Sequence, residues 1–259
     1  MARKSSRGAT RNPVRKQRPA IAWKSLFTQL LMISALSAVT AAVIYIQQDD
    51  TLPILHVGVE GDFTHADKAT LVKAVMPHVT GNFINVDVDK LRAAGESLAW
   101  VKLVQVKRIW PDSLSLVVEE HTAIAQWGQT ALLNKDGELF TPNKASFPKN
   151  LTLIQGPEGS SELMVQRYKV LDKLFAQLEL DLTIVTMDKR RAWTLQFDNG
   201  MEIRLGRAEN KQRLQRFLKV YKAGLNNYKT DIAVVDMRYT NGLAVTWKLG
   251  QKPDFNGTV

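Results

Sequence analysis

The chain contains no cysteine among its 259 residues. A structural disulfide, an iron–sulfur cluster and a thiol nucleophile are therefore excluded. A part of the chain that folds outside the cytoplasm must then be held together by its own apolar core. About 200 residues are long enough to form one or two such cores.

The sequence also lacks the short motifs that carry catalysis. It has no His-Glu-x-x-His pair, nucleophile elbow, phosphate-binding P-loop or dinucleotide-binding glycine motif. Glu119 and Glu120 adjoin each other, but neighbours in a strand point to opposite faces and make a poor acid–base pair. We expect no catalytic residue, no metal and no cofactor, and an enzyme with an unrecognised site stays open as an alternative. None of the four histidines has a metal-ligand spacing: His56, His65, His78 and His121.

Acidic residues are missing from the first 24 positions, which hold eight Lys and Arg. The net charge of the whole chain is +10, so the rest of the chain carries only +2. The high charge is thus a property of the tail and does not indicate nucleic-acid binding by the folded part. We expect residues 1–24 to form a disordered cytoplasmic tail that is attracted to anionic lipid.

Charge of either sign is absent from Ser25 to Gln48, and the stretch Leu26–Ile46 is mainly apolar. About 20 such residues in a helix cross a bilayer core about 30 Å thick, so we expect one transmembrane helix over residues 25–48. Basic residues before it and Asp49 and Asp50 after it predict a cytoplasmic N-terminus and a C-terminal part outside the cytoplasm. A cleaved signal sequence and a buried helix of a cytosolic protein are the alternatives.

Residues 54–120 are predicted to form one small unit of order β-α-α-β-β. The segment from Ile54 alternates like a strand and breaks at Gly61, and Thr64 with Asp67 has the spacing of a capping box before the first helix. Pro77 is expected to kink or end that helix, and a second helix is expected to begin near Asp87. Two strands follow, over 101–109 and 113–120, joined by a turn that contains proline.

Residues 121–250 are predicted to form a second, β-rich unit, followed by a frayed tail over 251–259. Asp136-Gly137 and Asn199-Gly200 each indicate a hairpin between alternating strands. Amphipathic helices are expected over 162–180 and 209–228. The second helix has a basic face that we interpret as solvated: Lys211, Arg213, Arg216, Lys219 and Lys222. The last two strands, 232–239 and 243–248, are joined at Asn241-Gly242, and the final strand is expected at a sheet edge.

A β-α-α-β-β unit directly after a single span resembles a POTRA domain, and the whole chain resembles the FtsQ/DivIB family of bacterial cell-division proteins. The resemblance extends from the anchor to about Trp247. The segments that carry it are 98–120 with its Trp-Pro-Asp turn, 124–127, 156–160, 190–193 and 235–247. It implies an α+β fold with one transmembrane helix, a POTRA domain and a β-rich domain with two amphipathic helices.

The resemblance also implies a scaffold of the inner membrane at the division septum rather than an enzyme. Such proteins link early division proteins to the later ones that build septal peptidoglycan, and their C-terminal domain binds FtsB and, with it, FtsL. The POTRA domain is associated with recruitment of other divisome components. The main alternative is a POTRA-type chaperone or secretion component that binds extended β-strand substrates.

A partner segment can add a strand to an exposed sheet edge, where main-chain hydrogen bonds give affinity. By position, the resemblance places the partner on the last strand and the turn before it. The expected contact residues are Arg190, Arg238, Tyr239, Asn241, Gly242 and Trp247. Tyr239 and Trp247 are candidate aromatic anchors, although either could instead pack in the core, and Arg190 could be solvated.

Overall fold

The computed structural model describes residues 23–48, 51–207 and 211–253. It divides into two compact units. The first contains the N-terminal helix, the chain up to Pro53 and the loop Gly81–Asn85; the second contains Ile54–Thr80 and the chain from Val86 onward. The expectations for the basic tail up to residue 22 and for the last six residues lie outside the described part.

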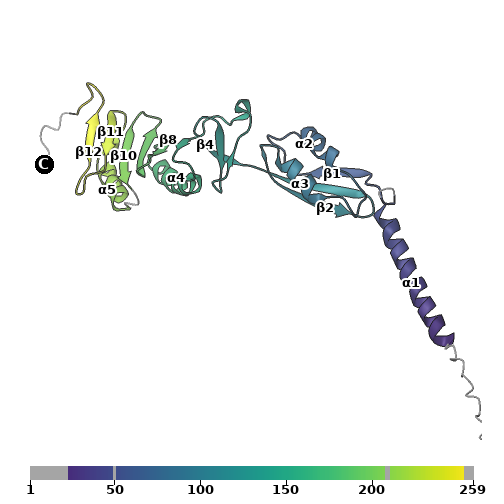
Figure 1. Cartoon of the computed structure of the whole chain (residues 1–259). Coiled ribbons are helices and arrows are strands. Elements are labelled where there is room, and N and C mark those ends of the chain that lie inside the picture. The colour runs from purple at the N-terminus through teal and green to yellow at the C-terminus, as the bar shows by residue number, and fades with distance from the viewer. Residues whose placement is uncertain (1–22, 49–50, 208–210, 254–259) are drawn as a thin grey trace, which may run out of the picture. The chain divides into compact units, whose positions relative to one another are not determined.

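Helix α1, Trp23–Gln47, is the predicted apolar helix (Figure 1). Its 25 residues give a length of about 38 Å, enough to cross a bilayer core. None of its side chains is buried, so the alternative of a buried helix is wrong. Its hydroxyl groups donate to carbonyls one turn earlier, for example Thr40 Oγ1 to Leu36 O at 2.8 Å, which lowers the cost of placing them in lipid. The helix is a candidate membrane span.

The C-terminal end of α1 is capped by a loop from a later part of the chain. The last carbonyls of a helix have no partner within it. Asn82 Nδ2 donates to Ile46 O at 2.7 Å and to Gln48 O at 3.0 Å, and Asn85 Nδ2 donates to Gln47 O at 3.0 Å. Asn82 is fully buried. The local sequence gives no sign of this cap, because its donors lie more than 30 residues away.

The β-α-α-β-β order is confirmed. The elements are β1 (His56–Glu60), α2 (Lys68–Val75), η1 (Met76–His78), α3 (Val88–Glu96), β2 (Val101–Ile109) and β3 (Ser113–Glu120). The sheet order is β1-β3-β2, with β3 parallel to β1 and antiparallel to β2. The helices cover one face, and the shared core consists mainly of Val59, Leu71, Val75, Leu91, Val104, Leu114 and Leu116.

The predicted capping box of α2 is wrong, because the cap is Asp67 itself. Its carboxylate accepts hydrogen bonds from the backbone N–H groups of Ala69 and Thr70 and from the Thr70 hydroxyl, and these bonds lower the pKa of Asp67. The backbone N–H of Thr64 binds the distant Glu120 instead. The helix ends at Val75 and passes into η1, which contains Pro77, as the sequence predicts.

The chain after residue 122 forms a nine-stranded mixed sheet of order β12-β11-β10-β9-β8-β7-β4-β5-β6. The strands are β4 (Ala123–Trp127), β5 (Ala131–Asn134), β6 (Leu139–Phe140), β7 (Leu153–Gln155), β8 (Leu182–Met187), β9 (Ala192–Phe197), β10 (Glu202–Arg207), β11 (Ile232–Asp236) and β12 (Ala244–Trp247). Both predicted hairpins form, as the antiparallel pairs β5–β6 and β9–β10.

Two helices share the main core of this sheet: α4 (Ser161–Ala176) and α5 (Lys211–Lys222). Phe175 of α4 and Phe217 of α5 are buried with ring centroids 5.8 Å apart, so both helices pack on the same face. Each helix ends earlier than the sequence predicts. After α5 the chain turns at Gly224, whose φ is 145°, into the short helix η3, Leu225–Tyr228.

Candidate protein-binding site

Strand β12 forms one edge of the nine-stranded sheet, as the sequence predicts (Figure 1). It pairs with β11 only, and no strand within residues 51–207 and 211–253 covers its other side. The backbone N–H of Lys248 donates toward β11, to Asp231 O at 2.7 Å. Because successive N–H groups alternate sides, those of Val245 and Trp247 point to the open side of β12. This edge is therefore a candidate acceptor for another strand.

The turn before β12 exposes an aromatic side chain. Tyr239 is 58% exposed, and Arg238 beside it is also exposed. The Arg238 guanidinium donates to both oxygens of Asp236, with Nη2 at 2.6 Å from Oδ2 and Nε at 2.9 Å from Oδ1. This pairing lowers the pKa of Asp236 and raises that of Arg238. The predicted contact Arg238 thus already has a carboxylate partner within the chain.

Two arginines of α5 hold this turn. Arg216 Nη1 donates to Tyr239 O at 3.1 Å and to Gly242 O at 3.0 Å, and its Nη2 donates to Thr240 O at 2.7 Å. Arg213 links the carbonyls of Leu205 and Arg238. Both arginines are half-buried, so the prediction of a solvated basic face is wrong for them; Lys211, Lys219 and Lys222 are exposed, as the sequence predicts.

A glycine in β10 makes room for these side chains. Gly206 has a φ of +73° at a bulge in the β9–β10 pairing. A Cβ there would lie 2.9 Å from Arg238 Cγ, closer than real Cβ atoms come, and 3.1 Å from Arg213 Nη1, which is a tight contact. Only glycine combines this backbone conformation with such a close approach.

Register places Arg190 at the same end of the sheet as the turn. Arg190 lies between β8 and β9, and the start of β9 pairs with the end of β10, which lies beside the end of β11 and the start of β12. Three strand spacings separate β9 from β12, about 14 Å. Arg190 is exposed, and among the described residues its guanidinium has no hydrogen-bond or ion-pair partner. The sheet therefore brings Arg190 to the same end as Arg238, Tyr239, Asn241 and Gly242.

Trp247 lies at the other end of β12, where it pairs with Ile232. It is half-buried, packs against the main core, and meets the ring of Tyr228 edge-on at 5.8 Å between centroids. Its indole contributes to the packing of the strand, while its backbone belongs to the open edge.

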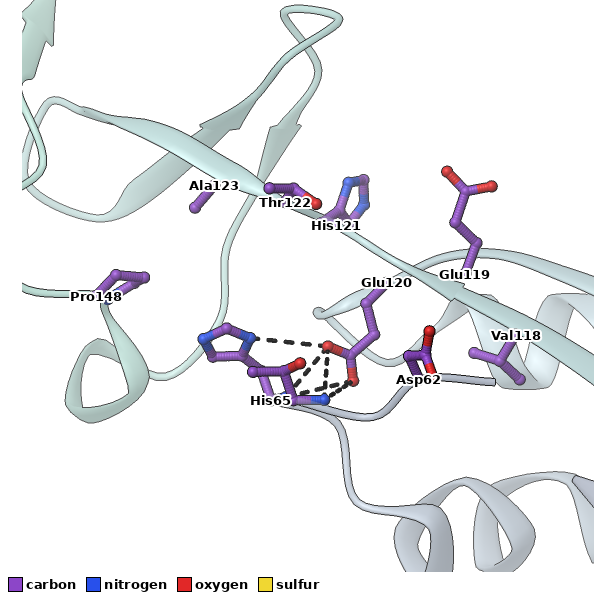
Figure 2. Close-up of a pocket in the computed structure, with 10 residues that line it drawn as sticks. Asp62, His65, Val118, Glu119, Glu120, His121, Thr122, Ala123 and Pro148 are labelled. Atoms are coloured by element: carbon purple, nitrogen blue, oxygen red, sulfur yellow. Dashed lines mark hydrogen bonds and ion pairs between the residues drawn. The ribbon is translucent and has the colours of Figure 1, made fainter. Parts of the chain in front are cut away.

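A pocket at the junction of β3 and β4 is lined by Glu119, Glu120 and two of the four histidines, His65 and His121 (Figure 2). Figure 2 shows Glu120 pointing toward His65 and Glu119 pointing away, as neighbours in a strand should. The Glu120 carboxylate accepts from the backbone N–H groups of Thr64, His65 and Ala66, at 2.7 Å for Ala66. His65 stacks on Trp100 with ring centroids 4.0 Å apart. The carboxylate is therefore used to order the loop over 64–66.

Within the described residues no three His, Asp or Glu side chains gather as a metal site would require.

Two family models match successive parts of the chain. Residues 52–121 match the POTRA domain of FtsQ type, and residues 125–238 match the C-terminal domain described as cell division protein FtsQ/DivIB. The chain is 33% identical to the cell division protein FtsQ of Burkholderia pseudomallei (strain K96243), over 87% of this chain and 90% of that protein. It is 32% identical to the FtsQ protein of Coxiella burnetii (strain RSA 493 / Nine Mile phase I), over 87% and 93%. The chain belongs to the FtsQ family.

Membership in the FtsQ family establishes a role in cell division. It also confirms the α+β fold with a POTRA domain that the sequence predicts. The match to the FtsQ C-terminal domain includes Arg190 and ends at Arg238, so Tyr239, Asn241, Gly242 and Trp247 lie just beyond it. The contact residues predicted from the resemblance therefore stay predictions.

Proposed function

We propose that this chain is an inner-membrane scaffold of the divisome that binds FtsB, and with it FtsL, on the open edge of β12. In this proposal residues 1–24 are cytoplasmic, 25–48 cross the membrane, and the POTRA domain (54–120) and β domain (121–250) lie in the periplasm at the septum, with 251–259 as a flexible tail. The scaffold links early division proteins to late ones and controls septal peptidoglycan synthesis, and the POTRA domain recruits other divisome components.

The open edge of β12 is the observation that carries this proposal. A strand edge offers unpaired N–H and C=O groups, and natural proteins cover or disrupt such edges unless they are used. Here the edge is four residues long and is preceded by an exposed aromatic side chain. Main-chain pairing along β12 would give affinity, and the exposed side chains of the turn would give specificity.

The charges at this end of the sheet favour a partner with acidic residues. Arg190 is exposed without a carboxylate partner among the described residues, whereas Arg238 is already paired with Asp236. In this proposal Arg190 forms an ion pair with an acidic side chain of the partner, and the ring of Tyr239 packs against the partner. Because the Trp247 side chain packs against the core, it holds β12 in place, while its backbone is part of the strand that pairs with the partner.

Amide hydrogen exchange on the full chain, with and without the periplasmic part of FtsB, tests the proposal directly. A strand added to β12 slows exchange at Val245, whose N–H group faces the open side. The N–H of Thr246 points the other way, toward β11, so its exchange is already slow and stays unchanged. Binding of FtsB without any change at Val245 would place the partner elsewhere.

Depletion of the protein in cells separates the proposal from the chaperone alternative. A divisome scaffold produces filamentous cells when it is lost. Loss of outer-membrane proteins at normal cell length would support a POTRA-type chaperone that binds extended substrates broadly.

A further inference from the structure

One end of the three-stranded POTRA sheet carries three exposed apolar side chains, which we call the apolar tip: Leu55, Ile109 and Trp110. They are 63%, 50% and 78% exposed. The Trp110 ring contacts no other ring within the described residues, and its indole N–H has no hydrogen-bond partner there. The fold of the POTRA domain therefore leaves this aromatic side chain exposed to solvent.

The sheet topology brings the three residues together. His56 at the start of β1 pairs with Ser113 at the start of β3, and Ser113 pairs with Ile109 at the end of β2. Leu55 N donates to Asp112 O at 2.9 Å, which extends the pairing by one residue. Adjacent strands lie about 4.8 Å apart, so the tip is about 10 Å wide from β1 to β2.

The tip is also the end at which the chain enters the POTRA domain from α1. Leu55 follows Gln47, the last residue of α1, by eight positions. Eight extended residues reach at most about 28 Å. A second connection is shorter, because Asn85 binds the end of α1 and Val86, the next residue, accepts a hydrogen bond from Arg108 at 3.1 Å. Both connections restrict how far the tip can move from the end of the span.

The composition of the tip suits the interface of a bilayer. Tryptophan prefers the headgroup level, where its ring is in an apolar setting and its N–H meets water or headgroups. Lys107, two residues before Ile109, is exposed and basic and can approach anionic headgroups. An exposed apolar cluster that eight residues connect to a span can reach the lipid surface.

We propose that the apolar tip inserts into the outer interfacial layer of the bilayer that α1 crosses. This inference rests on the proposed membrane anchor. The tip then gives the POTRA domain a second attachment to lipid, with Trp110 as its main contact. Rotation of the domain about the end of α1 is restricted, and the surface that it offers to other divisome proteins is held at a fixed tilt to the membrane.

The absence of cysteine makes the test simple, because single cysteines can be introduced without removing others. The full chain is reconstituted into vesicles of phosphatidylcholine with a minority of phosphatidylglycerol and spin-labelled at Ile109→Cys. Collisions with oxygen and with a water-soluble nickel chelate report the depth of the label. Leu31→Cys in α1 serves as the bilayer reference, and Val170→Cys, on the exposed side of α4, serves as the water reference.

The expected result is a label at position 109 that meets the nickel chelate less often, and oxygen more often, than the label at 170. Adding Trp110→Ser shifts position 109 toward the values at 170, while the label at 31 stays unchanged. If position 109 matches position 170 while position 31 reports the bilayer, the tip lies in water and this inference is wrong, which would favour a protein partner for the tip. If position 31 also reports water, the anchor proposal itself fails.

Discussion

Two loops of this protein are held by charged side chains from distant parts of the chain, one by a carboxylate and the other by guanidinium groups. In the POTRA domain the Glu120 carboxylate accepts hydrogen bonds from three consecutive N–H groups, at residues 64–66. In the β domain the Arg216 guanidinium donates to three carbonyls of the turn over 239–242. In both cases a side chain far away in the sequence replaces the partners that regular secondary structure would supply.

The difference lies in what each loop exposes. The Glu120 side chain is only 9% exposed, and its loop leads into α2 and packs beside Trp100. Arg216 is half-buried, and its turn presents Tyr239 to solvent. We infer that Glu120 mainly serves stability, whereas Arg216 mainly serves recognition.

Glu120→Gln should lower the free energy of unfolding by about 2 kcal/mol, because a largely buried, charged acceptor of three backbone N–H groups is lost and an amide N–H₂ is brought toward them. Urea unfolding of the full chain in detergent measures the change. Glu119→Gln is the matched control. The Glu119 side chain is 55% exposed, and its Oε1 lies 3.5 Å from Lys102 Nζ. An ion pair at the surface is expected to contribute less than about 1 kcal/mol. Equal losses in the two variants would contradict a stabilising role specific to Glu120.

Tyr239→Ala should weaken binding of FtsB by about 2 kcal/mol or more, roughly thirtyfold, if the ring is a hot spot of the interface. The free energy of unfolding should change little, because the side chain is exposed. Calorimetry with the full chain measures the affinity, and Val170→Ala on α4 is the control. An affinity equal to that of the unmodified chain would remove Tyr239 from the site.

Arg216→Lys keeps the charge but removes the planar fork that joins three carbonyls. We expect about a tenfold loss of FtsB affinity, or about 1.4 kcal/mol, with faster amide exchange over residues 240–243. Lys219→Ala on the exposed side of α5 removes a charge without touching the turn and serves as the control. Loss of affinity in Lys219→Ala alone would show that charge, and not the ordered turn, matters.

Stability should fall slightly as the pH drops below about 6.5, the ordinary pKa of histidine. Burial lowers the pKa of His121 in the folded state, so the unfolded chain takes up the proton first. The contribution is therefore complete above the unfolded pKa and is lost as the pH falls toward the folded one. Nearby Glu138 and Glu119 partly oppose the shift, and Lys102 adds to it.

Melting temperatures between pH 8 and pH 5 test this prediction, with His121→Gln as the comparison. The imidazole accepts a hydrogen bond from Asn134 Nδ2 at 3.1 Å and stacks on Phe140, and both contacts suit the neutral ring. A pH profile that is the same in both proteins would assign the dependence to other groups.

Local patterns predicted the regular elements well. Strands β2 and β3 have the predicted bounds, and the Asp-Gly and Asn-Gly pairs give hairpins, because alternation and turn chemistry act between near neighbours. Helix α3 begins next to Asp87, as predicted, and the structure shows that Asp87 caps it. Helix ends were less accurate: the expected cap at Thr64 failed because Glu120, more than 50 residues away, takes its N–H.

The candidate binding site was predicted only in part, because it also depends on contacts between residues far apart in the sequence. The edge position of the last strand follows from its place at the end of a ribbon, and the resemblance supplied Tyr239 and Arg190. Arg213 and Arg216 appeared only as members of a basic helix face. Nothing in their spacing reveals that they face a turn that begins more than 20 residues later.

By itself the amino-acid sequence determined the candidate span, the segregation of charge before it, the order of strands and helices, and the family. These properties depend on composition and on contacts between residues close in the chain. The tertiary structure was needed to show which carbonyls Arg216 binds, and that Leu55, Ile109 and Trp110 lie at the same end of a sheet. Those outcomes depend on pairings between distant segments, which the packing of the whole domain selects.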